Sequence, residues 1–343
     1  MSIILLLLYI CTYIISINAG NVSTSELSAL AALYASTDGD NWRYYPDDGT
    51  QWDFINNTNP CIDHWEGITC DSDCSFTSTS PCTITKIVLD EYRLEGTLPE
   101  ELGLLTSLTT MNMYGNRLHG SVPIAINSMV ELTSVDLGLN VLQGSLPPLP
   151  TNLIFLYVGY NRFGGEFPTT LGTLTKLQEL QIAGNLLTGT LPTIIGNLKA
   201  LTKMEIHKNN MNGTLPAELG ELTVLNHLEC DFNSYIGTLP DTLSQLTALT
   251  LLKCGNNGFS GSFPEVLLAL TNLQKLQMGH TNLTGVLPSD MGLLNQLQLL
   301  DLSINMFTGS IPMSLYTITH LTVLDISHTS VNGTIASEIG HLL

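Results

Sequence analysis

Residues 204–216 read MEIHKNNMNGTLP, and residues 300–312 read LDLSINMFTGSIP. Both stretches have apolar residues at positions one and three, Asn at six, an apolar residue at eight, Gly at ten and Pro at thirteen. Apolar residues at alternate positions are typical of a strand that buries every second side chain. The two stretches therefore predict a short strand and a turn that recur along the chain.

The glycine of this pattern forms a column along the sequence. Its members are Gly96, Gly120, Gly144, Gly165, Gly189, Gly213, Gly237, Gly261, Gly285, Gly309 and Gly333. The step is 24 residues, except for 21 residues between Gly144 and Gly165. Proline follows each glycine after three residues, except in the last repeat, which has Ala336. The columns predict a stack of about eleven coils in which each coil contacts its neighbours. The short repeat, with Pro147-Pro148-Leu149-Pro150, is expected to lack a convex helical turn and to alter the local curvature.

Each slot of the repeat has a predicted structural role. The carboxamide of Asn can donate to and accept from backbone groups that a turn leaves unpaired. Asn occupies that slot at Asn116, Asn140, Asn161, Asn185, Asn209, Asn233, Asn257 and Asn305. Thr281 and Thr329 can replace part of this function, whereas Tyr92 cannot. Glycine permits a close approach or a positive φ, and proline does not extend a sheet ladder.

Composition excludes several classes of protein. The chain has 343 residues, of which 44% are hydrophobic and 12% charged, so it is not a disordered chain. Acidic residues outnumber basic ones 30 to 11, giving a net charge of −19. Such a charge disfavours nucleic acid and anionic membrane surfaces as partners. Basic partners and neutral glycans remain compatible with it.

The N-terminus and the sequons indicate the secretory pathway. Residues 1–17 are apolar and uncharged, and Ala19 precedes a possible cleavage point, so residues 1–19 are predicted to be a signal peptide. The alternative is an uncleaved membrane anchor. No second segment of this kind occurs, so no other membrane span is expected in this chain. Glycosylation sequons occur at Asn21, Asn56, Asn212, Asn282 and Asn332.

The cysteines fall into two groups. Four of them lie within 22 residues and are predicted to form two disulfides: Cys61, Cys70, Cys74 and Cys82. Three pairings are possible, and we favour Cys61–Cys70 with Cys74–Cys82. Cys230 and Cys254 occupy equivalent slots in successive coils. Because parallel side chains on neighbouring strands would strain a disulfide, we expect two buried free thiols there.

The repeat from residue 84 to residue 343 resembles the plant-type leucine-rich repeat. Residues 20–83 resemble the N-terminal cap of such arrays, with an apolar helix from Ser25 through Leu33, then Asn41-Trp42, then Cys61-x-x-x-Trp65-x-Gly67-Ile68-Thr69-Cys70. The resemblance implies an α/β repeat solenoid, a right-handed leucine-rich-repeat horseshoe or superhelix with a parallel concave β-sheet and a helical disulfide cap. It also implies roles in ligand recognition, as in receptor ectodomains, secreted inhibitors and adhesion proteins.

The solvent-facing residues of the concave strands are expected to form a ladder that varies from coil to coil. They are Val88, Asn112, Asp136, Tyr157, Gln181, Glu205, Glu229, Lys253, Gln277, Asp301 and Asp325. Aromatic residues flank the second to fourth coils, at Tyr114, Phe155, Tyr157 and Tyr160. Exposed aromatic side chains on a rigid face stack on sugar rings or anchor protein partners. The alternative is that Phe155 and Tyr160 pack against flanking loops.

The sixth to eighth coils carry a second candidate site. Its residues are Lys203, Glu205, His207, His227, Glu229, Asp231 and Lys253. Stacked Glu205 and Glu229 should raise the pKa of at least one of them unless a cation intervenes. We considered a solvated charged face, a polar or pH-sensitive ligand site and a metal site, and we expect no metal. An open sheet face offers no water-excluding pocket, and no phosphate loop or nucleophile motif occurs, so catalysis is not expected.

Residues after the slot glycines form a third column, rich in Thr and Ser, that is similar to the hydroxyl rows of ice-binding solenoids. Small hydroxyl residues are common there, and Glu166 interrupts the row, so ice binding is not favoured.

The chain reaches Leu343 within a repeat, and we expect the natural product to continue. We predict an extracellular, receptor-ectodomain-like protein, secreted or held at the cell surface, that binds a protein or glycan without a cofactor. The alternative is a soluble secreted inhibitor or a cell-wall or adhesion protein. The sequence indicates no particular oligomeric state.

Overall fold

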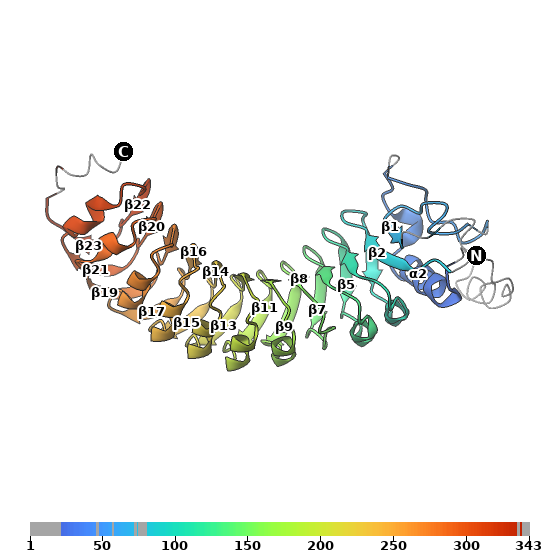
Figure 1. Cartoon of the computed structure of the whole chain (residues 1–343), viewed down its shortest axis with the longest axis horizontal. Coiled ribbons are helices and arrows are strands. Elements are labelled where there is room, and N and C mark those ends of the chain that lie inside the picture. The colour runs from blue at the N-terminus through green and yellow to red at the C-terminus, as the bar shows by residue number, and fades with distance from the viewer. Residues whose placement is uncertain are drawn as a thin grey trace. The chain divides into compact units, whose positions relative to one another are not determined.

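The computed structural model describes residues 22–45, 48–56, 58–71, 74, 81–334 and 337. The predicted signal peptide and the sequon at Asn21 lie outside these ranges. The chain divides into two compact units, Met1–Arg162 and Phe163–Leu343, which are treated separately below. In both units the chain winds through successive coils, each with a strand on one side and a helical turn or loop on the other (Figure 1).

The first unit begins with helix α2 (Thr24–Ser36). Oγ of Ser23 accepts a hydrogen bond from the backbone N–H of Glu26, and the backbone N–H of Ser23 donates to the Glu26 carboxylate, a capping box that fixes the start of the helix. A short 3-10 helix, η1 (Gly39–Asn41), follows. Trp42, Trp52 and Trp65 are buried below 6% exposure and pack against one another. This aromatic cluster is the core of the N-terminal segment.

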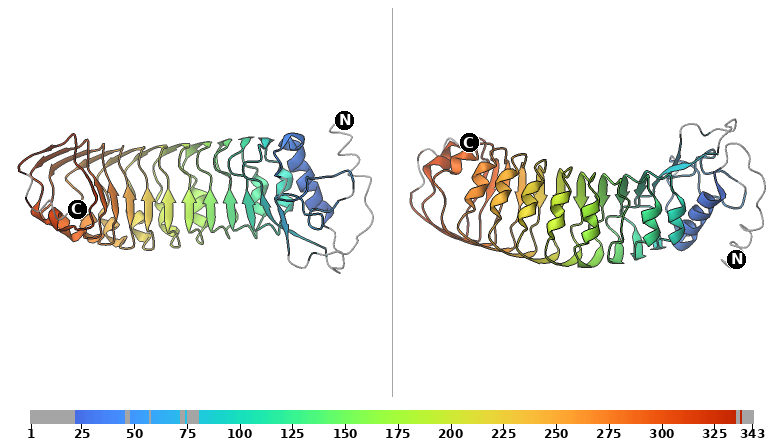
Figure 2. Two further views of the ribbon diagram at one scale, coloured as in Figure 1. Left: turned by 90° about the horizontal axis from the view of Figure 1, so that it is seen from above. Right: turned by 60° about the horizontal axis from the view of Figure 1, so that its bottom comes forward.

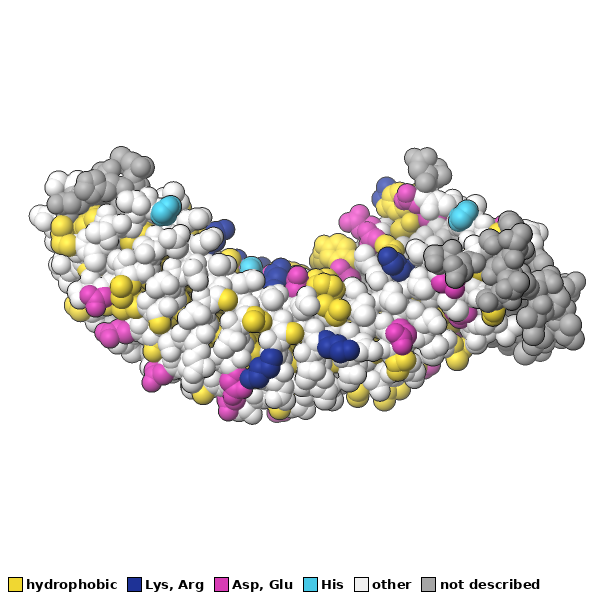
Figure 3. Space-filling view, in the orientation of Figure 1, with side chains coloured by type: hydrophobic (Ala, Val, Ile, Leu, Met, Phe, Trp, Pro, Cys, Tyr) yellow, Lys and Arg dark blue, Asp and Glu magenta, His cyan; other side chains and the backbone are white. Residues whose placement is uncertain are grey.

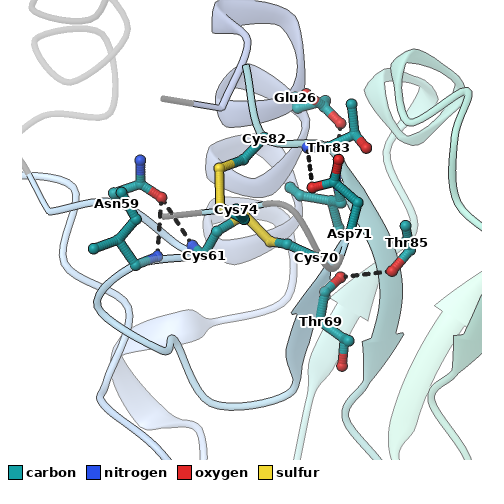
Figure 4. Close-up of a disulfide and its surroundings, with 12 residues drawn as sticks. Glu26, Asn59, Cys61, Thr69, Cys70, Asp71, Cys74, Cys82, Thr83 and Thr85 are labelled. Carbon is teal, nitrogen blue, oxygen red and sulfur yellow. Dashed lines mark hydrogen bonds between the residues drawn. A yellow bond between two sulfur atoms is a disulfide. The ribbon is translucent and has the colours of Figure 1, made fainter. Parts of the chain in front are cut away.

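Two disulfides close the segment before the first repeat, Cys61–Cys70 and Cys74–Cys82 (Figure 4). The favoured pairing is therefore confirmed. Cys70 ends strand β1 (Ile68–Cys70), and Cys82 lies beside the strand that opens the repeats. Cys230 and Cys254 in the second unit are free and buried, as predicted.

Two sheets run through each unit, and we name them sheet A and sheet B. In the first unit sheet A contains β1, β2 (Ile84–Val88), β4 (Thr110–Asn112), β6 (Ser134–Asp136) and β8 (Phe155–Tyr157). Sheet B contains β3 (Glu95–Thr97), β5 (Arg117–Gly120) and β7 (Val141–Gly144). The β1–β2 pair is antiparallel, and the other pairs in this unit are parallel.

The second unit repeats this arrangement with parallel strands throughout, lying side by side like rungs (Figure 2). Sheet A contains β10 (Glu179–Gln181), β12 (Lys203–Glu205), β14 (His227–Glu229), β16 (Leu251–Lys253), β18 (Lys275–Gln277), β20 (Leu299–Asp301) and β22 (Val323–Asp325). Sheet B contains β9 (Arg162–Glu166), β11 (Leu186–Gly189), β13 (Asn210–Gly213), β15 (Ser234–Gly237), β17 (Gly258–Gly261), β19 (Asn282–Val286), β21 (Met306–Gly309) and β23 (Ser330–Val331).

A short 3-10 helix follows sheet B in most coils. The first unit has η2 (Glu100–Leu104) and η3 (Ile124–Ser128). The second has η4 (Thr169–Thr173), η5 (Thr193–Asn197), η6 (Ala217–Glu221), η7 (Asp241–Gln245), η8 (Glu265–Ala269), η9 (Met291–Leu293) and η10 (Met313–Thr317). The repeat proline directly precedes nearly all of them, as Pro216 precedes η6. The short repeat forms no helix between β7 and β8, as its sequence predicted.

The core is a ladder of apolar side chains stacked coil upon coil. In sheet A of the second unit, Leu180, Met204 and Leu228 pair in register and are fully buried. A fully buried leucine contributes about 2 kcal/mol to folding. Gly213 has φ +73°, and an added Cβ would lie 2.6 Å from the Thr190 side chain, so this slot requires glycine. The predicted repeat solenoid is confirmed in each unit.

Candidate functional site

The solvent-facing ladder of sheet A has the register predicted for it within each unit. In the first unit Val88, Asn112, Asp136 and Tyr157 are successive Cα partners on neighbouring strands. In the second the partners run Gln181, Glu205, Glu229, Lys253, Gln277, Asp301 and Asp325. Neighbouring rungs are about 4.8 Å apart, so each side chain adjoins the next one, and only the Glu205–Glu229 and Asp301–Asp325 pairs bring together identical residues. The ladder is a continuous surface of varied chemistry in both units.

Aromatic side chains border this ladder in the first unit. Phe155 and Tyr157, both half-buried, occupy the two ends of β8, with ring centroids 6.2 Å apart. Tyr114 and Tyr160 lie beyond the ends of their strands, with exposed fractions of 36% and 46%. Tyr114 thus lies beside β4 and the other three aromatic residues lie on or beside β8, with β6 between the two strands, and each of the four residues is partly exposed. Their role in binding stays a prediction.

Charged side chains form a connected network on sheet A of the second unit. The imidazole Nε2 of His227 lies 2.9 Å from Oε1 of Glu229 and 3.4 Å from Oε1 of Glu205. Lys203 contacts Glu205 at 2.8 Å, and Lys253 contacts Glu229 at 2.8 Å. Lys203 and Lys253 therefore lie beside the two stacked carboxylates, and the His227 imidazole lies between them. Such cations are the condition under which the sequence predicted that neither carboxylate would have a raised pKa.

The network shifts the pKa values of its members in opposite directions. Burial alone would raise the pKa of Glu229, but hydrogen bonds from His227 and Lys253 outweigh it and lower that pKa to about 2. The pKa of Glu205 is also lowered, because His227 and Lys203 outweigh its burial. The same two carboxylates raise the pKa of His227. The arrangement stabilises charge on all three side chains.

His207 and Asp231 lie beside this network. Nδ1 of His207 is 3.3 Å from Oε2 of Glu229. Within the described part of the chain, Oδ1 of Asp231 is buried without a hydrogen-bond partner, and burial raises the pKa of this carboxyl group. The candidate ligand atoms of Glu205, His227 and Glu229, and those of His207, Glu229 and Asp231, lie within 4.8 Å of one another. Because Lys203 and Lys253 already contact Glu205 and Glu229, we interpret the cluster as an ion-pair network.

Comparison with known proteins places this repeat in a family. Residues 23–71 match the family described as leucine rich repeat N-terminal domain, and residues 176–198 and 320–342 match leucine rich repeat. The PEPR1–AtPEP1 crystal structure has a TM-score of 0.78 and 28% identity, over 93% of this chain and 47% of that one. The Arabidopsis receptor kinase HAESA, in complex with the peptide hormone IDA and the co-receptor SERK1, has a TM-score of 0.68 and 27% identity, over 89% and 53%.

The chain is a leucine-rich-repeat protein. It spans about half the length of the two receptor ectodomains that it resembles. A plant ice-binding protein shares the fold, with a TM-score of 0.71 and 24% identity, over 92% of this chain and 100% of that one. None of the curated proteins is a significant sequence match.

Sheet B of this leucine-rich-repeat protein has a different surface from sheet A. In the second unit its outward rows combine hydroxyl and amide residues, such as Thr188, Asn212 and Thr308, with exposed apolar residues, among them Leu186, Ile236 and Met306. Three sequons, at Asn212 on β13, Asn282 on β19 and Asn332 after β23, are exposed on these rows. The sequon at Asn56 is exposed in the N-terminal segment. Charged side chains are few and scattered on the face drawn in Figure 3.

Sequence reasoning missed a cavity of about 320 Å³ in the first unit. It is lined by Tyr45, Asp48, Gly67, Val88, Asp90, Glu91 and Tyr92. These residues come from separate segments of the N-terminal cap and the first coil. No motif joins them, so the only available signal was the high acidic content of this region.

Among the described residues, no helix is long and apolar enough to cross a bilayer.

Proposed function

We propose that this leucine-rich-repeat protein is an extracellular, non-catalytic binding protein that recognises a peptide or protein on the solvent-facing side of sheet A. The observation that carries the proposal is the contrast between the two sheets. Sheet A presents aromatic side chains in the first unit and a network of acidic and basic side chains in the second. In the second unit, the sheet B strands from β11 to β23 present only uncharged hydroxyl, amide and apolar side chains, with sequons at Asn212 and Asn282. A surface that discriminates between ligands needs chemically varied side chains such as those of sheet A.

A peptide is supported as the ligand by both the chemistry and the comparisons. In the first unit, partly exposed Phe155 and Tyr157 supply rigid apolar area at a small entropic cost. In the second unit, taken by itself, Lys203, Glu205 and Lys253 supply charges that select a complementary register. The resembling HAESA structure contains a peptide hormone. The two disulfides and the exposed sequons support an extracellular location.

The resemblance to receptor ectodomains favours a receptor-like protein over a soluble inhibitor or a wall protein. Sequons on sheet B also argue against ice binding there, because glycans at Asn212 and Asn282 would break up a flat hydroxyl surface. We therefore propose receptor-like recognition as the main function.

The proposal is tested by selecting ligands and then altering sheet A. Peptides are selected from a random display library on the secreted protein, and their affinities are measured for the wild type and for Tyr114→Ala with Tyr157→Ala. We expect the double variant to weaken binding by at least tenfold, because two anchoring rings are lost. Thr188→Ala with Thr308→Ala on sheet B is the control and should leave affinity unchanged. Peptides that respond only to the sheet B control would overturn the proposal, as would an exclusive preference for a glycan array.

A further inference from the structure

The cavity in the first unit adjoins sheet A. Val88 is the first rung of the solvent-facing ladder, and Asp90 follows it on the same segment. Asp90 also accepts a long hydrogen bond of 3.5 Å from Asn112, the next rung. The volume of about 320 Å³ lies at the lower end of the range for small-ligand sites. The cavity can therefore receive one side chain of a ligand that lies along sheet A.

The lining is acidic and aromatic. Asp48, Asp90 and Glu91 line the cavity, and none of them forms an ion pair within the part of the chain that the structure describes. The nearest cations in the sequence, at Arg43, Lys86 and Arg93, are not lining residues. The guanidinium of Arg43 does lie 4.8 Å from the centroid of the lining ring of Tyr45, so three carboxylates face one nearby cation. The field inside the cavity is consequently negative, which favours a cationic occupant.

Two tyrosines give the cavity fixed aromatic walls. The hydroxyl of Tyr92 donates to buried Glu66 at 2.8 Å, and the backbone N–H of Tyr45 donates to the same carboxylate oxygen at 2.6 Å. The rings of Tyr45 and Tyr92 meet edge to face, with centroids 5.2 Å apart. Burial, Glu66, Asp48 and Asp90 all raise the pKa of Tyr92, in keeping with the negative surroundings. Glu66 thus holds both tyrosines in place before any ligand arrives.

The geometry favours an organic cation over a metal ion. In the described part of the chain, the side-chain groups whose ligand atoms converge within 4.8 Å do not include Asp48, Asp90 or Glu91. A metal ion needs such convergence, whereas a guanidinium group spreads five N–H donors over a plane. A guanidinium also stacks on aromatic rings, and Arg43 does so on Tyr45 at 4.8 Å.

From these observations we propose that the cavity binds the guanidinium group of an arginine side chain. The proposal rests on the proposed function, since the arginine would belong to the peptide recognised by sheet A. The carboxylates of Asp90 and Glu91 accept its N–H donors, and one of the two tyrosine rings, whose planes lie 68° apart, faces its plane. The cavity thereby selects peptides with an arginine at the end that lies over the first coil.

The probe is N-acetyl-arginine-N-methylamide, titrated into the whole protein and followed by NMR. We expect millimolar binding, as for other small ligands. The analogue with neutral citrulline should bind at least tenfold more weakly, because it lacks the charge. Asp90→Asn with Glu91→Gln should weaken the arginine probe about tenfold. The control is Glu131→Gln, which removes an exposed carboxylate elsewhere in the same unit and should have no effect.

Equal binding of the arginine and citrulline probes would overturn the proposal, as would unchanged binding in the Asp90/Glu91 variant with its fold verified by circular dichroism. A lysine probe that binds as tightly as arginine would refute the specificity for guanidinium. The outcome is separable from that of the proposed function, because the probe is too small to reach the aromatic patch around Tyr157. Probe binding without any sheet A peptide would leave the cavity valid and refute the proposed function.

Discussion

The asparagine slot shows how one side chain organises a whole turn. Nδ2 of Asn209 donates to the carbonyl groups of Ile182, Ile206 and His207 at 3.1–3.3 Å, and its Oδ1 accepts from the N–H of Leu187. Both ends of the carboxamide therefore satisfy backbone groups of two adjacent coils. Tyr92, which occupies this slot in the first coil, instead donates to Glu66.

We predict that Asn209→Ala lowers the free energy of unfolding by about 3 kcal/mol, because several buried backbone groups lose their partner at once. Denaturant unfolding followed by circular dichroism measures the change. The matched control is Asn210→Ala at the neighbouring, exposed position, which should change stability by less than about 0.5 kcal/mol. Equal losses in the two variants would show that the slot is not a special site.

His227 makes the stability of the second unit depend on pH. Its pKa is raised in the folded state, so its contribution is complete below its unfolded pKa of about 6.5 and is lost as pH rises through the folded value. Glu229 has its pKa lowered to about 2, so its contribution is complete above about 4.5 and is lost as pH falls toward 2. The network is therefore most stabilising between about pH 4.5 and 6.5.

We predict that His227→Gln lowers the melting temperature more at pH 5.5 than at pH 9, because the stabilisation from the imidazolium charge decreases as pH rises through the raised pKa of His227. The difference should be a few degrees, because the side chain is partly exposed and screened by solvent. Thermal melts at both pH values test this, with His119→Gln on the exposed surface of the first unit as control. A loss that is the same at both pH values would contradict a role for the imidazolium charge.

The structural roles of the residues in the repeat slots could be predicted from the sequence, because each residue type has a distinct hydrogen-bonding or conformational property. Asn209 and Gly213 met those expectations. Other residues gave no such signal: Lys208, Phe232 and His280 precede the asparagine slot with φ between 51° and 57°, a conformation that their types do not predict. The register of the coil imposes that backbone. The burial of Asp231 Oδ1 without a partner among the described residues likewise results from local packing that its neighbours in sequence do not reveal.

At the scale of elements, Glu26 joins the N-terminal helix to the first repeat. Its Oε2 accepts from Ser23 within the capping box, and its Oε1 accepts from the backbone N–H of Ile84 at 3.0 Å, where β2 begins. The side chain is 6% exposed. One carboxylate therefore caps α2 and accepts from a backbone N–H at the start of β2.

We predict that Glu26→Ala costs about 3 kcal/mol of stability, whereas Ser23→Ala costs about 1 kcal/mol, because the second change removes a cap and leaves the link to β2 intact. Denaturant unfolding of both variants measures the difference. If the two substitutions cost the same, the bond from Ile84 contributes nothing beyond the cap.

The strands could be predicted from alternation, and their register in each unit followed from the 24-residue step. The helical turns are 3-10 helices of three to five residues, too short for a periodic signal. The acidic cavity was unpredictable for another reason. Tyr45, Gly67 and Val88 come together only after the disulfide-closed cap has folded against β2, and no spacing in the sequence encodes that contact.

At the scale of the whole molecule, the net charge and the positions of the sequons determine which ligands are favoured and which surface is open to them. A net charge of −19 favours basic ligands and speeds their association at low salt. In the second unit the sequons lie at Asn212, Asn282 and Asn332, on or beside sheet B strands, and none lies on a sheet A strand. Glycans attached there would leave the ladder of sheet A accessible to a ligand.

This distribution predicts opposite effects of glycans on the two sheets. Removing the acceptors by Asn212→Gln with Asn282→Gln should leave the affinity for selected peptides unchanged. Asp301→Asn, by contrast, creates an acceptor followed by Leu302 and Ser303 on the sheet A ladder, two rungs or about 10 Å from Lys253. A glycan at that position should reduce affinity at least tenfold by occupying the ligand's path. Asp301→Asn with Ser303→Ala removes the same charge without creating the acceptor, and should bind normally. The affinities of the three secreted variants for the selected peptides test this prediction, and mass spectrometry shows whether each acceptor Asn carries a glycan. If a bulky glycan on sheet A leaves binding intact, the ligand binds to another surface.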